Sequence, residues 1–378
     1  MSAVYRFLAS CARAECDASH YAFIARQAAR VDVWDGVLAE AERQGVAPLV
    51  YWHAKALGFE FPEDVRRGLR ALYVRHRLAN RIRMSVLCDI LRAFEAAGIR
   101  GLVLKGAALV HLVYSDPALR PMRDVDLLVP RADVVRAQVL LGRLGFDAPL
   151  PDDGVLPNRH MAAATRHTGG MLISVEVHHN LFRHEDLPLS FEMDNVTVSP
   201  CSFALRGCEI AVNALGYEDM LWHLCQHMRL SAGVFGANRL IWAADIVSFA
   251  ERFVADVNWS HVQARYPSVL KTLSLLHFLT PLSAPLLTQA GIRPGDEPEG
   301  IGADFAGWPR ASLREQRAKG WGGILRDTLF PAEWWLRLYY ELGGADPLWF
   351  ARWVRHPLHI AGWVRQLALE RLGIRRSL

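Results

Sequence analysis

The sequence predicts an α+β protein that is mostly helical, with one small mixed-sheet core flanked by N- and C-terminal helical segments. Two observations predict this class. Apolar residues recur every three or four positions through residues 1–98, which is typical of helices. After Gly98 the period changes, and short runs of strand-forming residues alternate with helical stretches over about 100 residues, as in a compact α/β unit.

Three breaks in the sequence delimit the predicted core elements. Lys105-Gly106 interrupts the first β-like run, Pro130 ends the second, and Gly145 follows the helix between the second and third. The predicted elements are a strand at 99–104, a helix at 107–114, a strand at 124–129, a helix at 132–144, a strand at 171–177 and a fourth strand at 195–198.

Helical periodicity returns at 217–253 and at 268–292. We therefore divide the chain into a helical segment at 1–98, the α/β core at 99–200, a helical domain at 201–300 that completes a substrate cleft, and a basic, tryptophan-rich helical segment at 301–378.

Composition excludes several classes of protein. The chain has 378 residues, 52% hydrophobic and 22% charged, so it is not disordered and can bury a large core. A net charge of +4 is small for a general nucleic-acid coat. The six cysteines contain no CxxC pair, which favours reduced thiols over a zinc site. With no signal-peptide pattern and no uninterrupted apolar span, we expect a cytoplasmic protein.

Two carboxylates on the second predicted strand could carry chemistry. Asp124 and Asp126 are two residues apart, so both side chains share one face while Val125 faces the core. If the strand containing Glu176 pairs beside them, a third carboxylate joins the same site. Oxygen-rich sets of this kind suit Mg²⁺, with Mn²⁺ as an alternative, and three carboxylates can hold two ions.

An anion site is predicted upstream of these carboxylates. Gly106 allows close approach of a ligand, and the helix that begins at Ala107 directs free N–H groups toward an anion. Lys105, Arg120 and Arg123 add positive charge. An anion cradle next to a cation-binding carboxylate set indicates a metal–nucleotide site.

These motifs resemble a known family. The stretch LVLKGAALVHLVYSDPALRPMRDVDLLVPRADVVRAQVLLGRLGF, followed by VEVHHNLF, is similar to the bacterial uncharacterised nucleotidyltransferase family of the DNA polymerase β-like superfamily. The matching residues are Lys105, Gly106, Tyr114, Arg120, Arg123, Asp124, Asp126, Glu176 and His178. A weaker match extends to His223, His227, Arg239 and Asp245. Two positions depart from the superfamily pattern, because Ala107 replaces a serine or glycine and Glu176 replaces an aspartate.

The resemblance implies a metal-dependent enzyme that moves a nucleoside monophosphate from an NTP to an acceptor hydroxyl and releases pyrophosphate. In that reading Asp124, Asp126 and Glu176 hold Mg²⁺, and Lys105, Gly106, Ala107, Arg120 and Arg123 bind the nucleotide. The acceptor is unknown and could be a small molecule, a peptide, a protein or an RNA. The alternative is a non-catalytic module on the same fold that binds a nucleotide or a partner.

Several residues have two readings. His178 could accept a proton from the nucleophile or be a hydrogen-bonded structural histidine. His223 and His227 share a helix face, where zinc binding is less favoured than packing or a place in the substrate groove. Tyr114 and Arg239 are auxiliary substrate candidates, and for Arg239 and Asp245 we favour a helix surface or an interhelix pair.

The last segment, 301–378, holds 7 of the 12 tryptophans and twelve basic against seven acidic residues. Tryptophans at helical spacing are more often core residues, so we expect Trp349, Trp353 and Trp363 to pack inside. Peripheral contact with a membrane or RNA through this segment is the alternative.

Overall fold

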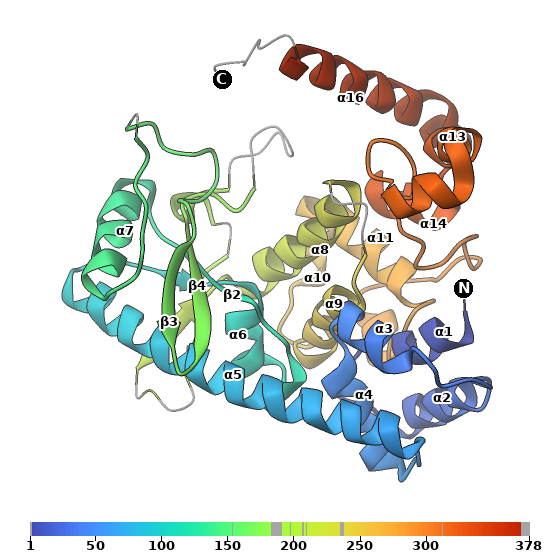
Figure 1. The fold of residues 1–378 in the computed structure, drawn as a ribbon, viewed down its shortest axis with the longest axis horizontal. Coiled ribbons are helices and arrows are strands. Elements are labelled where there is room, and N and C mark those ends of the chain that lie inside the picture. The colour runs from blue at the N-terminus through green and yellow to red at the C-terminus, as the bar shows by residue number, and fades with distance from the viewer. Residues whose placement is uncertain are drawn as a thin grey trace.

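The computed structural model confirms an α+β fold in which helices surround one mixed sheet (Figure 1). The structure describes residues 2–152, 154–182, 191–196, 198–205, 208, 210–234, 238–311 and 313–371. Within these residues the sheet has six strands in the order β3-β4-β2-β1-β6-β5. They are β1 (Leu102–Val103), β2 (Asp124–Leu128), β3 (Ala164–Thr168), β4 (Met171–His178), β5 (Cys201–Ala204) and β6 (Ala211–Ala214).

Strands β2 and β4, which carry the predicted carboxylates, are neighbours in the sheet. The two strands are parallel, and their register places Asp124 opposite Ser174 and Asp126 opposite Glu176. Val125, between the two aspartates, is fully buried. The expectation that Glu176 lies on a strand next to the aspartates is therefore confirmed, and the alternation of side chains along β2 points both aspartates to one face.

The edges of the sheet differ from the prediction. A strand at 195–198 is wrong: Met193–Asn195 forms the 3-10 helix η3, Val196 and Val198 lie outside any strand, and Thr197 is outside the described residues. The hairpin of β5 and β6 occupies this side of the sheet, since β6 pairs with β1. At the other edge β3, which the sequence did not indicate, pairs antiparallel with β4. Its polar sequence ATRHT lacks the apolar alternation that identifies a strand.

Helices precede and interrupt the sheet. They are α1 (Ala3–Ser10), α2 (Ala18–Ala28), α3 (Val37–Gln44), α4 (Ala47–Leu57), α5 (Glu63–Ala96), α6 (Lys105–Leu112) and α7 (Val134–Arg143), with 3-10 turns η1 (Pro117–Leu119) and η2 (Arg131–Asp133). The long helix α5 contacts α3 and α4 at one end and α7 at the other, so it joins the N-terminal helices to the sheet region (Figure 1). Helix α6 begins at Lys105, two residues before its predicted start.

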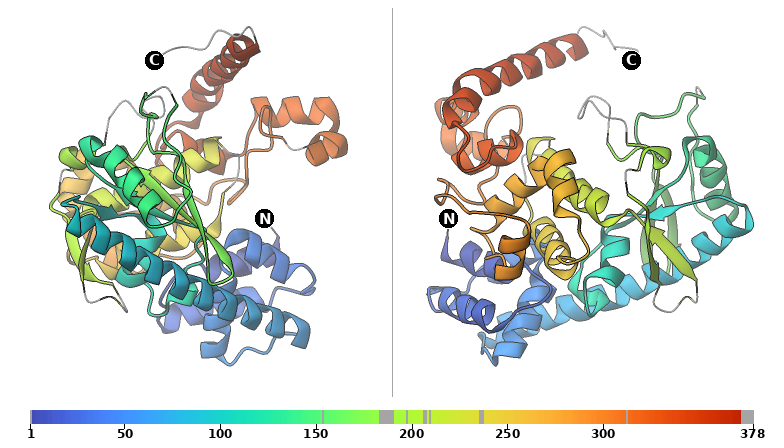
Figure 2. Two further views of the ribbon diagram at one scale, coloured as in Figure 1. Left: turned by 60° about the vertical axis from the view of Figure 1, so that its left-hand side comes forward. Right: turned by 180° about the vertical axis from the view of Figure 1, so that it is seen from behind.

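The helices after the sheet are α8 (Tyr217–Val234), α9 (Leu240–Arg252), α10 (Trp259–Arg265), α11 (Pro267–Leu276), α12 (Ala284–Gln289), α13 (Leu313–Leu329), α14 (Glu333–Tyr339), α15 (Leu348–Phe350), the π-helix η4 (Ala351–Arg355) and α16 (His356–Arg371). Helix α16 extends outward from the rest of the molecule (Figure 2). Among the described residues, no helix is both long and apolar enough to cross a membrane.

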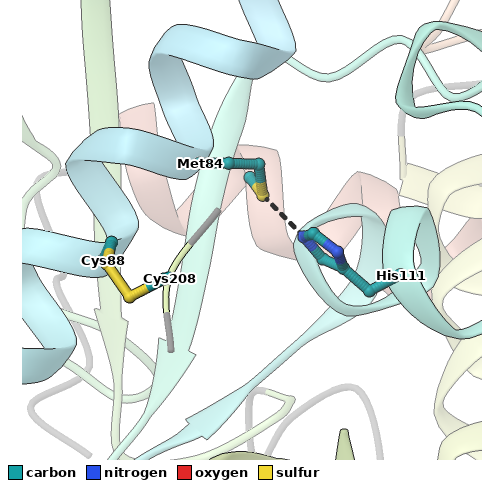
Figure 3. The surroundings of a disulfide bond; sticks show 4 residues. All are labelled: Met84, Cys88, His111 and Cys208. Carbon is teal, nitrogen blue, oxygen red and sulfur yellow. Dashed lines mark hydrogen bonds between the residues drawn. A yellow bond between two sulfur atoms is a disulfide. The ribbon is translucent and has the colours of Figure 1, made fainter. Parts of the chain in front are cut away.

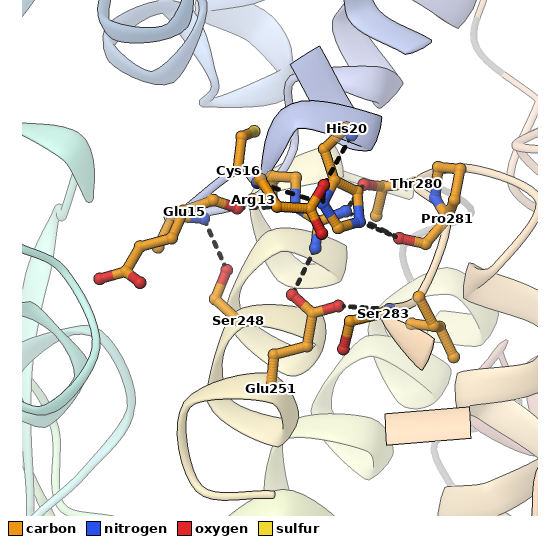
Figure 4. Close-up of polar contacts among 12 residues, drawn as sticks. Arg13, Glu15, Cys16, His20, Ser248, Glu251, Thr280, Pro281 and Ser283 are labelled. Atoms are coloured by element: carbon orange, nitrogen blue, oxygen red, sulfur yellow. Dashed lines mark hydrogen bonds and ion pairs between the residues drawn. The ribbon is translucent and has the colours of Figure 1, made fainter. Parts of the chain in front are cut away.

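A buried arginine attaches the N-terminal helices to α9 and the turn before α12 (Figure 4). The guanidinium of Arg13 is 1% exposed, pairs with Glu251 and donates to the carbonyl of Pro281 at 2.7 Å. The backbone N–H of Ala14 donates to Ser248 at 2.8 Å. Buried and fully partnered charges of this kind fix one relative placement of the elements that supply them.

A disulfide links Cys88 in α5 to Cys208, which follows β5 (Figure 3). The expectation of reduced thiols throughout is wrong for these two residues. Their Cα atoms are 5.9 Å apart although the residues are 120 positions apart in sequence. No local sequence pattern predicts that two such distant cysteines meet. The other four cysteines, all among the described residues, are free.

The tryptophans of the last segment divide into two groups. Trp334 and Trp335 on α14 are fully buried. Trp349 and Trp353 are each 61% exposed, so the expectation that they pack in the core is wrong. Trp363 is partly buried against Phe305 and His359.

Candidate active site

The parallel pair of β2 and β4 brings together three side chains that could hold a metal ion. Ligand atoms of Asp126, Glu176 and His178 all lie within 4.8 Å of one another, and these form the only such group of three in the described residues. Nε2 of His178 lies 2.9 Å from Oδ1 of Asp126 and 3.4 Å from Oε2 of Glu176. Because Asp126 faces Glu176 in the register and His178 is two residues further along β4, strand alternation alone places all three on one face.

Lys105 contributes the closest cation. Its Nζ lies 2.7 Å from Oδ1 of Asp126. The residue opens α6 with a φ of +46°, in the left-handed region that non-glycine residues seldom adopt. Backbone strain of this kind costs roughly 1–3 kcal/mol and is concentrated at functional sites. The ion pair with a buried aspartate provides a stabilising contact that offsets it.

The three carboxyls experience different electrostatic environments. Burial alone would raise the pKa of Asp126, but Lys105 and His178 outweigh it and hold this pKa well below its usual value. The hydrogen bond with His178 lowers the pKa of Glu176. Burial and the charge of Asp126 raise the pKa of Asp124, although part of its side chain is open to solvent. Asp124 is therefore the carboxylate that would gain most from an added cation.

A pocket of about 500 Å³ lies next to these carboxylates. Asp124 and Asp126 form part of its wall, and helices α3, α5, α6, α8 and α9 supply most of the rest. Five cationic side chains line it: Arg75, Lys105, Arg120, Arg123 and Arg239. Such a surplus of positive charge beside acidic groups is suited to a polyanion that carries metal ions.

Gly106 lies where the pocket approaches the start of α6. A Cβ atom at this position would be 3.0 Å from Cγ of Met122 and 3.4 Å from Cζ of Arg120, so a side chain would crowd this wall. Ala107, in contrast, is 2% exposed and belongs to the hydrophobic core rather than to the pocket lining.

Arg239 and Arg123 are the cations of the pocket with no carboxylate partner in the described part of the chain. Nε of Arg239 donates to the carbonyl of Arg43 at 3.1 Å, which leaves its terminal nitrogens for a ligand. Burial, together with Arg123, Arg120 and Arg43, lowers the pKa of Arg239 to about 10. A bound anion would reduce the repulsion between these crowded positive charges.

Arg120 is held by Asp245. Its Nε donates to both carboxylate oxygens at 2.7 and 2.8 Å, and the hydroxyl of Tyr114 donates to Oδ1 at 2.8 Å. Asp245 is 2% exposed, so it is an interhelix partner and not a surface residue, and its partner is Arg120 rather than Arg239. Tyr114 is 1% exposed, and these contacts favour a structural role for it.

His223 and His227 share one face of α8; His223 is 1% exposed and His227 is partly buried. Their burial lowers both pKa values, that of His227 to about 3, so both imidazoles are neutral. His227 lines the pocket and contacts the ring of Trp242, whereas His223 packs against Phe182 and its Nδ1 has no partner in the described residues. Neither belongs to the ligand group of three.

Sequence reasoning missed part of the pocket wall. Glu42, Arg75, His76 and Trp242 line it, and Arg75 pairs with Glu42 at 2.5 Å. The signal that could have indicated it is the run of arginines in the sequence of α5. Helical spacing cannot show which of its arginines meets another domain.

Comparisons with known proteins found a family match and a distant structural match. The crystal structure of an antigenic nucleotidyltransferase-like protein from Paracoccidioides brasiliensis is 18% identical and covers 54% of this chain and 96% of its own, but its TM-score of 0.32 is too low to support an argument. No curated protein matches the chain. The model of the family described as "Uncharacterised nucleotidyltransferase" matches residues 32–282, well over half of the sequence, and includes every site residue described above. The chain belongs to this uncharacterised nucleotidyltransferase family.

Proposed function

We propose that the protein transfers a nucleoside monophosphate from an NTP to an acceptor hydroxyl and releases pyrophosphate, as a member of the DNA polymerase β-like superfamily. The observation that carries the proposal is the register of β2 and β4, which sets Asp126 beside Glu176 at the wall of a pocket rich in arginine. Its metal dependence, its nucleotide and its superfamily are parts of this proposal.

The donor set fits a divalent cation. Carboxylate oxygens of Asp126 and Glu176 lie within reach of one ion, and Asp124 adds a third carboxylate from the same strand face. Oxygen ligands suit Mg²⁺, and the imidazole of His178 makes Mn²⁺ a second fit. A bound divalent ion would neutralise phosphate charge and lower the pKa of an attacking hydroxyl.

The other residues of the pocket would bind and orient the triphosphate. Arg239 and Arg123, which line the pocket, would neutralise its terminal phosphates, and Gly106 would leave space for it at the start of α6. Lys105 and His178 hold Asp126 ionised. Since phosphoryl-transfer catalysis is mostly positioning and charge neutralisation, these roles account for most of what the chain must supply.

The pocket combines three of the proposed segments. Segment 1–98 supplies Arg75, the core at 99–200 supplies the carboxylates, and 201–300 supplies Arg239. We propose that these three form the cleft and that 301–378 lies outside it.

A non-catalytic nucleotide-binding module is the second candidate. It is favoured by the contacts of Asp126, which already has Lys105 at 2.7 Å and His178 at 2.9 Å. In a module that never binds a metal, these two side chains would be the permanent partners of the carboxylate.

Transfer of label from α-labelled NTP tests the proposal. The wild-type protein, incubated with cell extract and each NTP in turn, should produce a labelled acceptor and pyrophosphate. Asp124→Ala and Asp126→Ala should each abolish the label, with a loss on the order of a thousandfold or more, because the surplus phosphate charge is then unneutralised. Asp89→Ala, on an exposed position of α5, is the matched control and should keep the wild-type rate.

Either of two results would contradict the enzyme assignment. One is a wild-type rate in the Asp124→Ala or Asp126→Ala variant. The other is tight binding of Mg²⁺ and NTP in calorimetry without pyrophosphate release for any acceptor fraction, which would support the binding module instead.

A further inference from the structure

Exposed apolar side chains are concentrated in the last segment of the chain, away from the proposed active site. On α13, Trp321, Leu325 and Leu329 follow one another at intervals of four residues and share a helix face. All three are exposed, Trp321 by 69%. Ile324 and Thr328 on the same helix are buried, so the helix has a separate side for its core contacts.

This face continues onto the next helices. Phe330 follows α13 directly, and its ring lies 5.5 Å from that of Trp353 in η4. Trp349 precedes Trp353 by four residues, in the unbroken run of α15, η4 and α16. We name the set of Trp321, Leu325, Leu329, Phe330, Trp349 and Trp353 the aromatic face. Leu358, 68% exposed, lies on α16, which projects outward (Figures 1 and 2).

The segment that carries the aromatic face is basic. Residues 301–378 carry twelve basic and seven acidic side chains, whereas the rest of the chain is nearly neutral. Arg326 lies next to Leu325 with its side chain 76% exposed and pairs with Asp327, and Arg352 and Arg355 flank Trp353 in the sequence. An apolar surface with a basic border complements an anionic partner that also has an apolar interior.

We propose that the aromatic face binds the surface of an anionic lipid bilayer and holds the protein at the membrane without spanning it. Tryptophan and phenylalanine are favoured at the boundary between headgroups and acyl chains, and exposed basic residues are attracted to anionic headgroups. Leu325 and Leu329 distinguish this partner from RNA, because aliphatic side chains insert among acyl chains but offer no ring for base stacking.

This surface is independent of the nucleotide pocket. The family model ends at residue 282, before α13, so the aromatic face is not part of what defines the family. The membrane would therefore determine where the protein acts, and the pocket would determine what it does.

Co-flotation of the full-length protein with vesicles tests the proposal. Binding is expected to vesicles of 70% phosphatidylcholine and 30% phosphatidylglycerol, to be weaker on pure phosphatidylcholine, and to fall as salt is raised. Trp353→Glu should lower the affinity by about tenfold or more, because it places a negative charge in the apolar face. Trp349→Ser should give a smaller loss, and brominated lipids should quench wild-type tryptophan fluorescence more than that of either variant.

Val33→Glu is the matched control, because it places the same charge on an exposed apolar residue of the N-terminal helical segment, outside the aromatic face. It should bind vesicles as the wild type does, and all variants should keep the wild-type circular dichroism and the label transfer in solution. Absence of wild-type vesicle binding, or equal binding by Trp353→Glu, would overturn the proposal. So would a dimer in sedimentation velocity, or a complex with RNA, that Trp353→Glu abolishes while vesicles are not bound.

Discussion

Two buried aspartates in this protein have similar partners and different surroundings. Asp245 and Asp126 are 2% and 3% exposed, and each contacts a basic side chain from outside its own helix or strand. At Asp245 one carboxylate meets one guanidinium, from Arg120, and one hydroxyl, from Tyr114. At Asp126, two further carboxyls are close by and a pocket opens beside it.

The two centres differ in how well their positive and negative charges balance. The charges of Asp245 and Arg120 cancel, and the helices around them leave little of either side chain exposed. The centre of Asp126 combines three carboxyls with one lysine, a neighbouring imidazole and a strained backbone at Lys105. A balanced buried pair stabilises one arrangement of helices, whereas an excess of carboxylates beside a cavity is suited to an added cation.

The largest expected effect separates the two centres by stability. Asp245→Ala leaves the guanidinium of Arg120 buried without its counter-charge, so the free energy of unfolding should fall by about 3–5 kcal/mol. Urea denaturation followed by circular dichroism measures this loss.

The double variant Arg120→Met with Asp245→Leu is the control. It removes both charges and should recover most of the lost stability, since apolar side chains of similar volume replace the pair. If Asp245→Ala lowers the free energy of unfolding by less than about 1 kcal/mol, the pair of Asp245 and Arg120 does not stabilise the fold, and its contrast with Asp126 fails.

A smaller effect is expected where the pocket holds its unpaired arginines. Arg239→Ala should weaken the binding of Mg²⁺–ATP by about 1.5–3 kcal/mol, or ten- to a hundredfold, because a hydrogen bond between charged groups is lost. Isothermal calorimetry measures the dissociation constant.

Arg252→Ala is matched to it, since Arg252 is an exposed arginine at the far end of the same helix, α9. Equal nucleotide affinity in the two variants would remove Arg239 from the proposed triphosphate site. Arg239→Lys should recover part of the affinity, because it restores the charge but not the planar set of donors.

The sequence was sufficient for the centre of Asp126. Alternation along a strand fixes Asp124 and Asp126 on one face, and the same rule places Glu176 and His178 together on a second strand. Only the pairing of the two strands had to be assumed. These relations are local, so a pattern of a few residues contains them.

The centre of Asp245 could not be found in this way. Arg120 and Asp245 are 125 positions apart, and nothing near either residue indicates the other. Arg75 is a second case, because only the packed fold shows that it lines the same pocket as residues of α9. Cys88 and Cys208 are a third case, since nothing near either cysteine indicates the other. Whether Trp349 and Trp353 are exposed depends on how much of the last helices packs against the rest of the protein. Helical spacing in the sequence does not contain this information.

The smallest expected effect concerns Asp124, whose pKa is raised by burial and by Asp126. A carboxyl with a raised pKa in the folded state opposes folding once it ionises, so this penalty is absent below the pKa of the unfolded chain and fully present above that of the folded protein. Asp124→Asn should therefore stabilise the metal-free protein at pH 7 and not at pH 3. Solvent screening at this partly open side chain keeps the gain below about 1 kcal/mol.

Thermal unfolding of Asp124→Asn and wild type at both pH values, in EDTA, measures this gain. Asp126→Asn is the contrasting variant and should be less stable than wild type at pH 7, because it loses its charge interaction with Lys105 and His178. The gain in Asp124→Asn should disappear when Mn²⁺ is added, since the ion would then stabilise only the protein that retains the carboxylate. A loss of stability in Asp124→Asn without metal would mean that Asp124, like Asp245, already has its counter-charge within the fold.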